Sequence, residues 1–460
     1  MSAHDSLDLS TPRTVHLVGV GGAGMSGLAR ILLQRGHAVT GSDLAAGRGL
    51  DELRALGGDI RVGHAAEAVG DVAAVVASTA VRDDNPELTA ARERGIPILR
   101  RAELLAALMA DERRILVAGT HGKTTTTSMA VVALQAAGGD PSFAIGGQLN
   151  ETGTNAHAGS DGRFVAEADE SDRSLLAYAP DVAVVTNVEL DHPDEFEDLD
   201  DVSDVFRRFL ANLRPDGLAV LCADDPDAMA LAPALGNVLT YGESPSADIR
   251  LVASGPGQGQ VRHDGDEIAR LALRVPGQHN LVNATAALAI CHLEGLDPAR
   301  AAEGLQAFTG AARRFQVLGE VDGVTVVDDY AHHPTELRVT LAAARSRSPE
   351  RVIVVVQPHR YSRTRVLGAE LGRAAAAADV VLVTDVYAAS EAPEPGVSGR
   401  LVADAAEESG ARVQYHPHLA DVVDELADLV QPGDMVLVTG AGDVSQVGPA
   451  LVGRLRGDRG

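Results

Sequence analysis

Short runs of apolar residues alternate along the chain with longer segments whose apolar positions repeat at helical spacing. The first run, at 14–18, leads through a glycine-rich loop into a segment in which Met25, Leu28 and Leu32 share one helical face. That segment stops at Gly36, and glycine commonly follows the last turn of a helix. Strands that alternate with helices in this way are typical of an α/β fold with mainly parallel sheets.

This strand–loop–helix pattern restarts twice, with strands at 114–118 and 324–327. The helix of the second unit is expected to end at Gly138. The remaining predicted elements are strands at 72–77, 96–99, 163–166, 182–186, 352–356, 380–384 and 435–438, a β-rich stretch at 238–275 and a helix at 281–293. A chain of 460 residues has room for three domains of about 150 residues each. We therefore predict domains at 1–111, 112–319 and 320–460.

The composition is that of an ordinary globular protein, with 45% hydrophobic and 23% charged residues. The formal net charge of −26 argues against bulk nucleic-acid binding, which needs a basic face, and against attraction to an anionic membrane. Because only 3% of the residues are aromatic and none is Trp, stacking of single-stranded bases is not expected either. Any anionic substrate must therefore be bound by local clusters of Arg and Lys.

Sequence features that point away from the cytoplasm are not evident. Cys222 and Cys291 are far apart and match no metal-ligand spacing, so we expect neither a disulfide framework nor a thiolate zinc site. The first twelve residues include His4, Asp5 and Asp8 and no apolar core, so no signal peptide is expected. No apolar run reaches the roughly 18 residues that span a bilayer. We predict a soluble, cytoplasmic protein.

Lys123 is the only lysine among the 39 Lys and Arg residues. A position that stays Lys in such a background is expected to need a compact ammonium rather than a planar guanidinium. It lies in the loop 119–124 (Gly-Thr-His-Gly-Lys-Thr), between a strand and a helix, where backbone amides form an anion site. We predict that Lys123 reaches the β and γ phosphates of a nucleotide and that the Thr124 hydroxyl ligates Mg²⁺. The spacing is not that of the common P-loop, because Gly119 stands three residues before Gly122 rather than five, and the alternative is a turn with a chance Gly-Lys-Thr.

A second glycine-rich loop, at 19–24 (Gly-Val-Gly-Gly-Ala-Gly), matches the dinucleotide-binding fingerprint. Asp43 follows near the expected distance, after a second strand. By itself this pattern favours a nicotinamide-dependent oxidoreductase. The loop only requires a pyrophosphate at a helix N-terminus, however, and any nucleoside diphosphate supplies one. A tight turn without a ligand is the third interpretation.

Acidic residues follow two predicted strands of the second unit. The stretch 167–172 (Glu-Ala-Asp-Glu-Ser-Asp) comes directly after a strand, and carboxylates at that end of a parallel strand lie where open α/β sheets bind ligands. Glu167 is the best-placed candidate for a Mg²⁺ contact. The strand at 182–186 is followed by Asn187, Glu189, Asp191 and His192. An acidic run is often only a solvated face and an Asp–His pair is often structural, so these interpretations stay open.

Four further polar segments are candidates for ligand contacts. Residues 277–280, with Asn283, open a helix, where Asn either binds an adenine edge or caps the helix. Residues 313–315 (Arg-Arg-Phe) and 359–363 (His-Arg-Tyr-Ser-Arg) suit phosphate or carboxylate binding, unless they are exposed basic loops. Residues 328–333 (Asp-Asp-Tyr-Ala-His-His) follow a strand, and since adjacent side chains rarely point together we expect substrate contact or packing there rather than a two-histidine metal site.

Taken in order, these motifs resemble the Mur ligases of peptidoglycan synthesis. The matching stretches are 19–26, 119–126, 167–172, 186–192, 279–284, 313–315, 328–336 and 357–364. The resemblance runs from about residue 13 to 450, and the ordered combination is highly specific. It implies an α/β fold of three domains: a Rossmann-like N-terminal domain that binds a UDP-sugar, a central P-loop-type ATPase domain with a mainly parallel sheet, and a Rossmann-like C-terminal domain.

The resemblance also implies an activity, the ATP- and Mg²⁺-dependent ligation of L-alanine to the lactyl carboxylate of UDP-N-acetylmuramate through an acyl phosphate. The Thr-His-Gly-Lys-Thr loop at 120–124 and the Asp-Tyr-Ala-His-His-Pro block at 329–334 favour this branch of the family. The expected partners are these small molecules, not nucleic acid or a membrane, and the protein is expected to be a monomer or weak homodimer. The alternatives are a ligase that reattaches a recycled tripeptide to the same UDP-sugar, a nicotinamide-dependent oxidoreductase, or a non-enzymatic nucleotide-binding regulator.

Residue by residue, the resemblance implies the following site. The residues that grip the UDP diphosphate are Gly19, Gly21, Gly22, Gly24, Met25, Ser26 and Asp43. The residues that bind ATP are Gly119, Thr120, His121, Gly122, Lys123, Thr124, Thr125, His279, Asn283 and Arg314. The metal ligands are Thr124, Glu167 and His192. The residues that position the amino acid and the acyl phosphate are Tyr330, His332, His359, Arg360 and Arg363.

The catalytic residues among them are Lys123, Glu167, His192, His359 and Arg360. Several family members hold a second Mg²⁺ with a carbamylated lysine. Because Lys123 is the only lysine, that device cannot operate in this chain, and the ligands of a second metal are left open.

Overall fold

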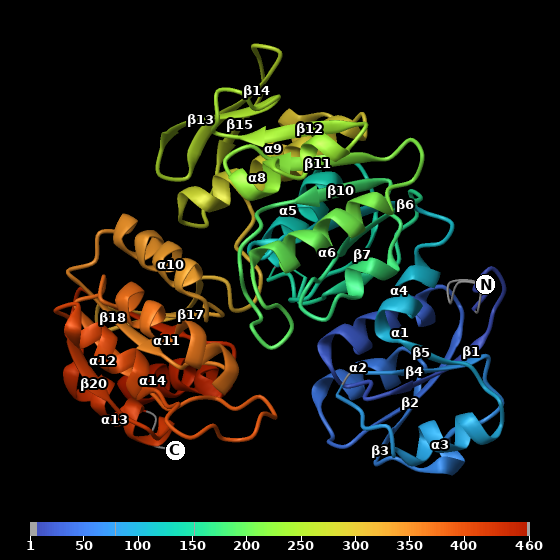
Figure 1. Ribbon diagram of the computed structural model, residues 1–460, viewed down its shortest axis with the longest axis horizontal. Coiled ribbons are helices and arrows are strands. Elements are labelled where there is room, and N and C mark those ends of the chain that lie inside the picture. The colour runs from blue at the N-terminus through green and yellow to red at the C-terminus, as the bar shows by residue number, and fades with distance from the viewer. Residues whose placement is uncertain (1–6, 79, 151, 458–460) are drawn as a thin grey trace. The chain divides into compact units, whose positions relative to one another are not determined.

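The computed structural model describes residues 7–78, 80–150 and 152–457, and His4 and Asp5 of the N-terminal segment lie outside this range. The described strands form three sheets, one in each third of the chain, with helices between the strands (Figure 1). The predicted three-domain α/β fold with mainly parallel sheets is confirmed. The exact boundaries stay predictions. The second sheet begins with β6 at Arg113 and the third with β16 at Gln316.

The contacts between described residues divide the chain into two compact units. The first comprises the described residues within Met1–Val188, Ser203–Arg250 and Ala286–Gly304. The second comprises those within Glu189–Val202, Leu251–Thr285 and Leu305–Gly460.

The first sheet has five parallel strands in the order β3-β2-β1-β4-β5. The bounds are β1 (Thr14–Val18), β2 (Ala38–Asp43), β3 (Asp59–Val62), β4 (Ala74–Ala77) and β5 (Ile98–Arg100). Val15, Leu17 and Val18 are completely buried, as expected for the central strand of a parallel sheet with both faces covered. Strands β2 and β3 are added on one side of β1, and β4 and β5 are added on the other side, so the strand order reverses between β1 and β4. The loop after β1 therefore lies where open α/β sheets bind ligands.

The second sheet has ten strands in the order β15-β14-β13-β12-β11-β10-β6-β9-β7-β8. The bounds are β6 (Arg113–Ala118), β7 (Ser142–Ala144), β8 (Ala156–His157), β9 (Arg163–Glu167), β10 (Val182–Val185), β11 (Leu218–Cys222), β12 (Val238–Gly242), β13 (Ile249–Gly255), β14 (Gln258–His263) and β15 (Asp266–Ala272). Strand β6 pairs in parallel with both β9 and β10. The segments that follow these three strands therefore emerge at one edge of the sheet, which places the loop 119–124 beside 167–172 and Asn187.

The third sheet has the order β16-β17-β21-β18-β19-β20, and only the edge pair β16–β17 is antiparallel. The bounds are β16 (Gln316–Val321), β17 (Val324–Asp329), β18 (Arg351–Val356), β19 (Val380–Val383), β20 (Arg412–Tyr415) and β21 (Asp434–Thr439). Along β18, Val352, Val354 and Val356 pack into one hydrophobic cluster while Ile353 and Val355 pack into another. Successive side chains of a strand point to opposite faces, so this continuous apolar run fills two cores at once.

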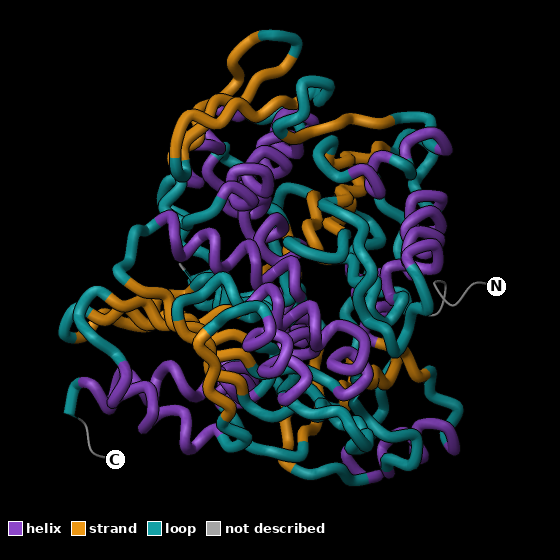
Figure 2. Tube along the Cα trace, turned by 60° about the vertical axis from the view of Figure 1, so that its left-hand side comes forward, coloured by secondary structure: helices purple, strands orange, loops and turns teal. Residues whose placement is uncertain are grey.

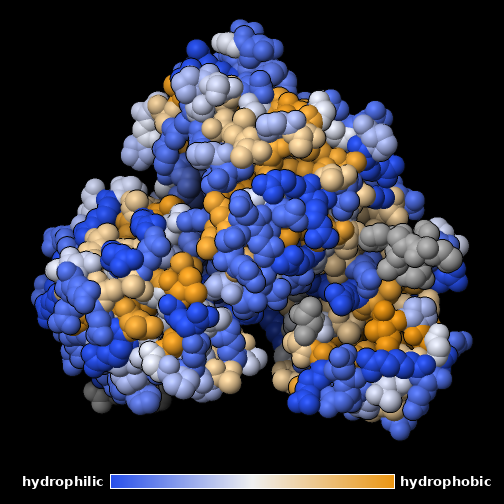
Figure 3. Space-filling model, in the orientation of Figure 1, coloured by the Kyte–Doolittle hydropathy of each residue, from blue (hydrophilic) through white to orange (hydrophobic). Residues whose placement is uncertain are grey.

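The helices lie between the strands in chain order, and Figure 2 shows this alternation as purple and orange segments. The bounds are α1 (Ala23–Gln34), α2 (Arg48–Ala55), α3 (Pro86–Glu93), α4 (Arg101–Leu108), α5 (Lys123–Ala136), α6 (Leu199–Ala211), α7 (Pro226–Met229), α8 (Gln278–Leu293), α9 (Pro298–Leu305), α10 (Pro334–Ser346), α11 (Tyr361–Ala375), α12 (Arg400–Glu408), α13 (Leu419–Leu429) and α14 (Val447–Leu455). None of the helices in the described part of the chain is long and apolar enough to cross a membrane. On the face drawn in Figure 3, apolar residues show as scattered patches among hydrophilic ones.

Most predicted strands are present, and the differences have physical reasons. The strand predicted at 96–99 begins instead at Ile98, because Pro97 has no backbone N–H for the ladder. Strands β3, β7, β8, β11, β16 and β20 were not predicted; of these, β7 and β8, with three and two residues, are too short to show a periodicity. Strand β2 was foreseen only as a second strand before Asp43, because Thr40, Gly41 and Ser42 hide its apolar pattern.

Candidate functional site

The loop between β6 and α5 has the backbone geometry of a phosphate-binding loop. Gly119 has φ = +130° and Gly122 has φ = +82°, conformations that L side chains rarely adopt. A Cβ on Gly119 would lie 2.0 Å from Thr186 Oγ1, so glycine is needed there for space as well. Gly122 is the N-cap of α5, which starts at Lys123. The loop therefore delivers Lys123 and Thr124 at a helix N-terminus, as predicted from the sequence.

The residues that follow β10 hold this loop in place. Asn187 makes two hydrogen bonds to His121: its Oδ1 accepts from the backbone N–H at 2.8 Å and its Nδ2 donates to the carbonyl at 3.0 Å. Thr186 Oγ1 donates to the same carbonyl at 2.6 Å, and the N–H of Thr120 donates to the Asn187 carbonyl at 3.1 Å. The loop shape is thus set by the neighbouring strand as well as by its own glycines.

The Lys123 ammonium is surrounded by oxygen atoms of the first unit. Its Nζ lies 2.9 and 2.8 Å from the two carboxylate oxygens of Glu170, 2.7 Å from the Gly119 carbonyl and 3.1 Å from the Thr120 carbonyl. Asp169 Oδ1 is 3.8 Å away. Burial alone would lower the pKa of Lys123, but the charges of Glu170 and Asp169 outweigh it and raise this pKa above its usual value. Lys123 is therefore firmly protonated.

Thr124 and Glu167 form a pair of hard oxygen donors at the same edge of the sheet. The Thr124 hydroxyl donates to Glu167 Oε2 at 3.2 Å, and the backbone N–H of Gly146 donates to Glu167 Oε1 at 2.7 Å. The second bond fixes the carboxylate at the end of β9 so that it faces the first turn of α5. Alcohol and carboxylate oxygens in this arrangement suit a divalent cation such as Mg²⁺.

The first glycine loop joins β1 to α1 at the switch point of the first sheet. The N–H groups of Gly19 and Val20 donate to the Ser42 carbonyl at 2.9 and 3.0 Å, and that of Gly21 donates to Asp43 Oδ2 at 2.8 Å. Asp43 thus holds the loop from the end of β2. Among the remaining predicted residues, Met25 is buried in α1 and the Ser26 hydroxyl donates to the Ala23 carbonyl.

A cavity of about 310 Å³ lies between the first glycine loop and the end of β9 within the first unit. Its walls include Gly22 and Gly24 of the first loop and, on the other side, Glu167 and Asp169. Asn155 also lines it and donates from Nδ2 to the Ala23 carbonyl at 2.8 Å. A ligand bound on the first loop can therefore extend toward the carboxylate that accompanies Lys123 and Thr124.

Arg101 is a wall residue that was not predicted from the sequence. It lines the same cavity, and a Cβ on Gly24 would lie 3.1 Å from its Cδ, so the side chain lies directly over the first loop. Arg101 could have been predicted from its position immediately after β5, because ligands of open α/β sheets bind at the carboxyl ends of the parallel strands. Ser78, just after β4, lines the cavity for the same topological reason.

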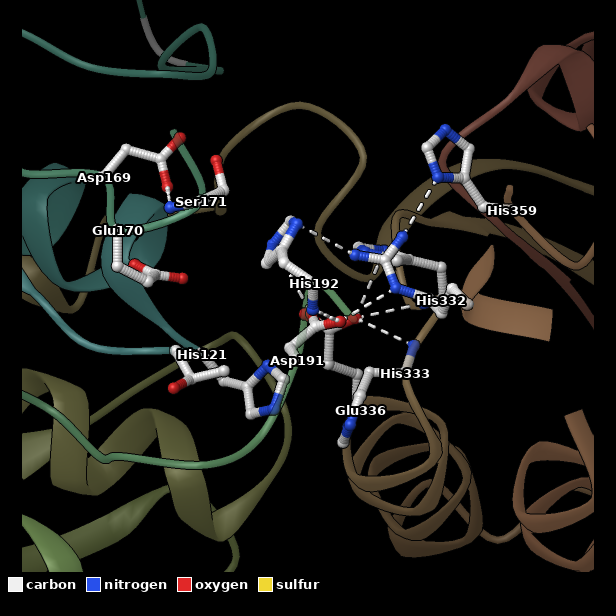
Figure 4. Close-up of polar contacts among 12 residues, drawn as sticks. His121, Asp169, Glu170, Ser171, Asp191, His192, His332, His333, Glu336 and His359 are labelled. Carbon is white, nitrogen blue, oxygen red and sulfur yellow. Dashed lines mark hydrogen bonds and ion pairs between the residues drawn. The ribbon is translucent and has the colours of Figure 1, made fainter. Parts of the chain in front are cut away.

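The second unit gathers another polar cluster around Arg363. Its Nε donates to Asp191 Oδ1 at 2.8 Å, and its two terminal nitrogens lie 3.1 Å from His359 Nδ1 and 3.3 Å from His192 Nδ1 (Figure 4). The side chains of Arg363 and Asp191 are only 4% and 5% exposed. Burial alone would raise the pKa of Asp191, but the guanidinium of Arg363 holds it well below its usual range. The cluster is thus a buried ion pair flanked by two imidazoles.

Aromatic rings extend this cluster. The Tyr330 ring contacts two guanidinium groups, with Arg313 Cζ at 5.0 Å and Arg314 Cζ at 5.1 Å from its centroid. The His332 ring packs edge-on against Tyr330 at 5.4 Å and against His359 at 5.7 Å. Burial lowers the pKa of His332 to about 4 and that of His359 to about 3. Both imidazoles are therefore neutral near pH 7 and available as hydrogen-bond partners.

Three residues of this second cluster have backbone conformations that are unusual for L residues. His192 has φ = +54°, Arg313 has φ = +60° and Arg360 has φ = +66°. Strained backbone of this kind persists where the surrounding structure dictates it and often accompanies functional sites. Arg360 is also fixed by its partners, since its backbone N–H donates to the Tyr387 carbonyl and its side chain forms an ion pair with Asp194.

The two adjacent histidines after β17 have different tasks, as expected. His332 Nδ1 lies 2.9 Å from the Tyr330 carbonyl, inside the ring cluster. His333 is the N-cap of α10, where its Nδ1 accepts the Thr335 backbone N–H at 3.2 Å.

His279 lines a separate cavity of about 380 Å³ in the second unit. Its walls also come from the β13–β14 turn at Gly257 and from Val339 and Ala343 of α10. Burial lowers the pKa of His279 to about 4, so its ring is neutral. Asn283, the other predicted adenine contact, is not among the cavity walls, and its Nδ2 lies 3.5 Å from Asn280 Oδ1.

The structure therefore brings the predicted residues together in separate groups. The first unit joins Lys123, Thr124 and Glu167 at one sheet edge, and the second joins His192, His332, His359 and Arg363. Sequence reasoning passed over the acidic partners Glu170 and Asp329, the latter accepting the backbone N–H groups of Phe315 and Ala331. Asp329 stood inside a quoted motif, and only its contacts reveal its task.

Comparisons with known proteins give the same picture along the chain. Residues 14–113 match the Mur ligase family catalytic domain, 117–291 the Mur ligase middle domain, and 313–442 the Mur ligase glutamate ligase domain. Together these matches cover well over half of the 460 residues.

Similar proteins span the full length of the chain. It is 51% identical to the UDP-N-acetylmuramate–L-alanine ligase of Saccharopolyspora erythraea, over 97% of this chain and 94% of that protein. It is 52% identical to the enzyme of that name in Kineococcus radiotolerans, over 96% of each. The crystal structure of UDP-N-acetylmuramate–alanine ligase from Thermotoga maritima matches with a TM-score of 0.80 at 30% identity, over 97% of this chain and 100% of that one.

Proposed function

Because the chain belongs to the Mur ligase family, we propose that it uses ATP to join L-alanine to the lactyl carboxylate of UDP-N-acetylmuramate. The full-length relatives at 51% and 52% identity carry this activity in their names. A murein peptide ligase from Psychrobacter arcticus is similar in fold, with a TM-score of 0.71, but only 24% identical. The alanine-adding reaction is therefore the better supported of the two.

The observation that carries the proposal is the cavity shared by the first glycine loop and Glu167. A sugar nucleotide whose diphosphate lies on the N-terminus of α1 directs its sugar into this cavity. Its carboxylate then approaches the edge of the second sheet, where Lys123 and Thr124 begin α5. The carboxylate to be activated and the loop proposed to bind ATP thus belong to the same unit. A nicotinamide-dependent oxidoreductase would not require this arrangement.

In the first step the lactyl carboxylate oxygen attacks the γ-phosphorus of ATP, the bond to the β-phosphate oxygen breaks, and an acyl phosphate and ADP result. Lys123 offsets the charge of the phosphate groups, and the loop amides orient them for in-line transfer. No covalent enzyme intermediate is needed, since the side chains act by position and charge.

The residues present fit a Mg²⁺ ion on the same edge. Thr124 Oγ1 and Glu167 Oε2 are 3.2 Å apart and are the hard oxygen ligands that this ion prefers. When bound, Mg²⁺ neutralises charge on the transferred phosphoryl group. His192, the third predicted ligand, belongs to the second unit, and its metal role stays a prediction.

In the second step the neutral amine of L-alanine attacks the acyl carbon, and the tetrahedral adduct breaks its C–O bond to phosphate and gives up one amine proton to water, which leaves the amide. We assign the binding of the amino acid to the cluster around Arg363 in the second unit. Its guanidinium and the neutral imidazoles of His332 and His359 are suited to the carboxylate of the amino acid.

The test is release of ADP by the purified protein with Mg·ATP, UDP-N-acetylmuramate and L-alanine, each omitted in turn. Release that requires all three establishes the activity. The variant Lys123→Ala is expected to lose at least about 100-fold in kcat, and Lys123→Arg serves as the matched control that keeps the charge but not the compact ammonium.

Two outcomes would change the assignment. Turnover with the tripeptide L-Ala-γ-D-Glu-meso-diaminopimelate but not with L-alanine moves the protein to peptide recycling. Absence of turnover with either amine, together with tight NAD binding, overturns the ligase proposal.

A further inference from the structure

The Lys123 ammonium already has a full set of partners within the first unit. An ammonium offers three N–H donors, whereas four oxygen atoms lie within 3.1 Å of Nζ. Two of these are backbone carbonyls of the phosphate loop, from Gly119 and Thr120, and two belong to one carboxylate, that of Glu170. A phosphate oxygen can reach this ammonium only if one of the partners withdraws.

The backbone partners are poorly placed to withdraw. The Thr120 N–H is bonded to the Asn187 carbonyl, and a Cβ on Gly119 would strike Thr186, so the loop is clamped against the end of β10. Glu170 is a side-chain partner on the segment after β9, and it carries the same sign of charge as a phosphate. If a phosphate group replaces the Glu170 carboxylate beside Lys123, the positive charge of the ammonium is still neutralised.

Glu170 is also unusual in its burial. Its side chain is 1% exposed, while that of Lys123 is 14% exposed, so the carboxylate is buried on the ammonium as its counter-ion. Burial raises the pKa of Glu170 to about 7, although the charge of Lys123 acts in the opposite direction. A buried ion pair of this kind contributes little net stability but costs much to separate.

We propose that Glu170 is the resting counter-ion of Lys123 and that the terminal phosphates of ATP bind by displacing it. Glu170 is then a positioning residue: it holds Lys123 extended in the loop before the nucleotide arrives and limits the affinity for ATP. This inference rests on the proposed ATP-dependent function and adds a residue that sets nucleotide affinity.

The decisive variant is Glu170→Gln, which keeps the size and one acceptor oxygen but removes the charge. Without the competing carboxylate, the Kd for Mg·ATP measured by calorimetry is expected to fall about tenfold. AMP, which lacks the phosphates that reach Lys123, is expected to bind the variant and the wild type with the same Kd within about twofold. A role in general folding would move both ligands together.

Asp169→Asn is the matched control for simple charge repulsion. It removes the same charge from the neighbouring residue, whose Oδ1 lies 3.8 Å from Nζ, too far for a hydrogen bond to the ammonium. Its effect on the Kd for Mg·ATP is expected to stay below about threefold. Equal tightening by both substitutions would mean that Glu170 acts only through the overall field, and that result overturns the exchange.

The single lysine supplies a second readout that does not depend on ATP. An amine-reactive reagent labels Lys123 and the chain's N-terminus, and peptide mass spectrometry separates the two. Glu170→Gln is expected to increase the labelling rate of Lys123 several-fold, because the ion pair that keeps it protonated and engaged is gone. Unchanged labelling together with an unchanged or higher Kd for Mg·ATP overturns the inference.

These outcomes are separable from those of the proposed function. Wild-type protein that ligates L-alanine, with a Glu170→Gln variant that binds ATP no more tightly, contradicts the exchange alone. If Glu170→Gln binds Mg·ATP more tightly than the wild type, but the wild type forms no amide, the proposed function alone is contradicted. If Glu170→Gln fails to fold, Glu170→Asp takes its place, because it keeps the charge on a shorter side chain that reaches Lys123 less well. A decrease of up to about threefold in the Kd for Mg·ATP, together with faster labelling of Lys123, supports the exchange. No change in either quantity contradicts it.

Discussion

Gly119 has φ = +130°, and a Cβ added to it would lie 2.0 Å from Thr186 Oγ1 and 2.9 Å from the Thr186 backbone nitrogen. Gly119→Ala therefore meets both backbone strain and a collision with the neighbouring strand. We expect it to lower the free energy of unfolding by about 2–4 kcal/mol and to abolish ATP-dependent turnover. Urea unfolding and ADP release measure the two effects.

Gly138→Ala is the matched control for this prediction. Gly138 has φ = +96°, but a Cβ there would have no heavy atom within 4 Å. Only the strain of about 1 kcal/mol is expected, with turnover close to that of the wild type. Similar losses in the two variants would show that the contact with Thr186 is unimportant.

His332 gives a pH-dependent contribution to stability. Its side chain is 11% exposed, and burial lowers its pKa in the folded protein to about 4 from an unfolded value of about 6.5. The unfolded chain therefore binds a proton first as the pH falls, so stability decreases between about pH 6.5 and pH 4. His332→Gln is expected to reduce this acid-induced loss by at most about 3 kcal/mol, measured by urea unfolding at a series of pH values.

The exposed His418 provides the comparison for the same experiment. His418→Gln changes only an exposed side chain, and the slope of stability against pH is expected to stay that of the wild type. If wild type and His332→Gln give parallel curves, the neutral buried state of His332 is refuted.

At the scale of elements, the segment that follows β10 contacts the loop before α5 and holds it in place. Asn187 makes two hydrogen bonds to the backbone of His121, in the middle of this loop. Asn187→Ala is expected to raise the KM for ATP about tenfold, corresponding to about 1–3 kcal/mol for an amide partner lost at a buried site. Steady-state ADP release at varied ATP measures it.

Asn212→Ala is the control at the other kind of position. The side chain of Asn212 is exposed and makes a single 3.2 Å hydrogen bond to the Leu176 carbonyl, far along the chain from the loop. The KM for ATP is expected to stay within about twofold. If the KM for ATP of Asn187→Ala is no higher than that of this control, the segment after β10 does not position the loop for ATP binding.

Across the chain, the two cysteines report on opening of the buried parts of the first unit. Cys222 lies in β11 and is 4% exposed, and Cys291 lies in α8 and is completely buried. Burial raises the pKa of these thiols to about 11 and about 12. A thiol-specific reagent at pH 8 is expected to react at least about 100-fold more slowly with the native chain than with the chain in denaturant.

Cys222→Ser and Cys291→Ser separate the two reactions. If the native protein loses one thiol at the rate of the denatured chain, the strand or helix that carries it opens locally. That result would contradict the burial described for that element.

The alternation of apolar runs and helical segments along the chain was enough to predict a three-domain α/β fold with mainly parallel sheets. Local physics explains this success. A buried parallel strand such as β18 needs a continuous apolar run, and a loop such as 119–124 needs glycine where φ is positive. Such requirements act on neighbouring residues, so they are visible in a single sequence. Short strands such as β8 impose no such run and were missed.

Partners from distant parts of the chain were decided only by the tertiary structure. Glu170 was read as part of an acidic stretch, but its carboxylate contacts an ammonium 47 residues away. Asp191 was read as half of an Asp–His pair, but it pairs with Arg363, 172 residues away. Strand order brings such side chains together, and it depends on the packing of whole sheets rather than on any local spacing. The sequence by itself therefore determined the strands, helices and glycine turns, while the ion pairs between distant side chains were decided only by the fold.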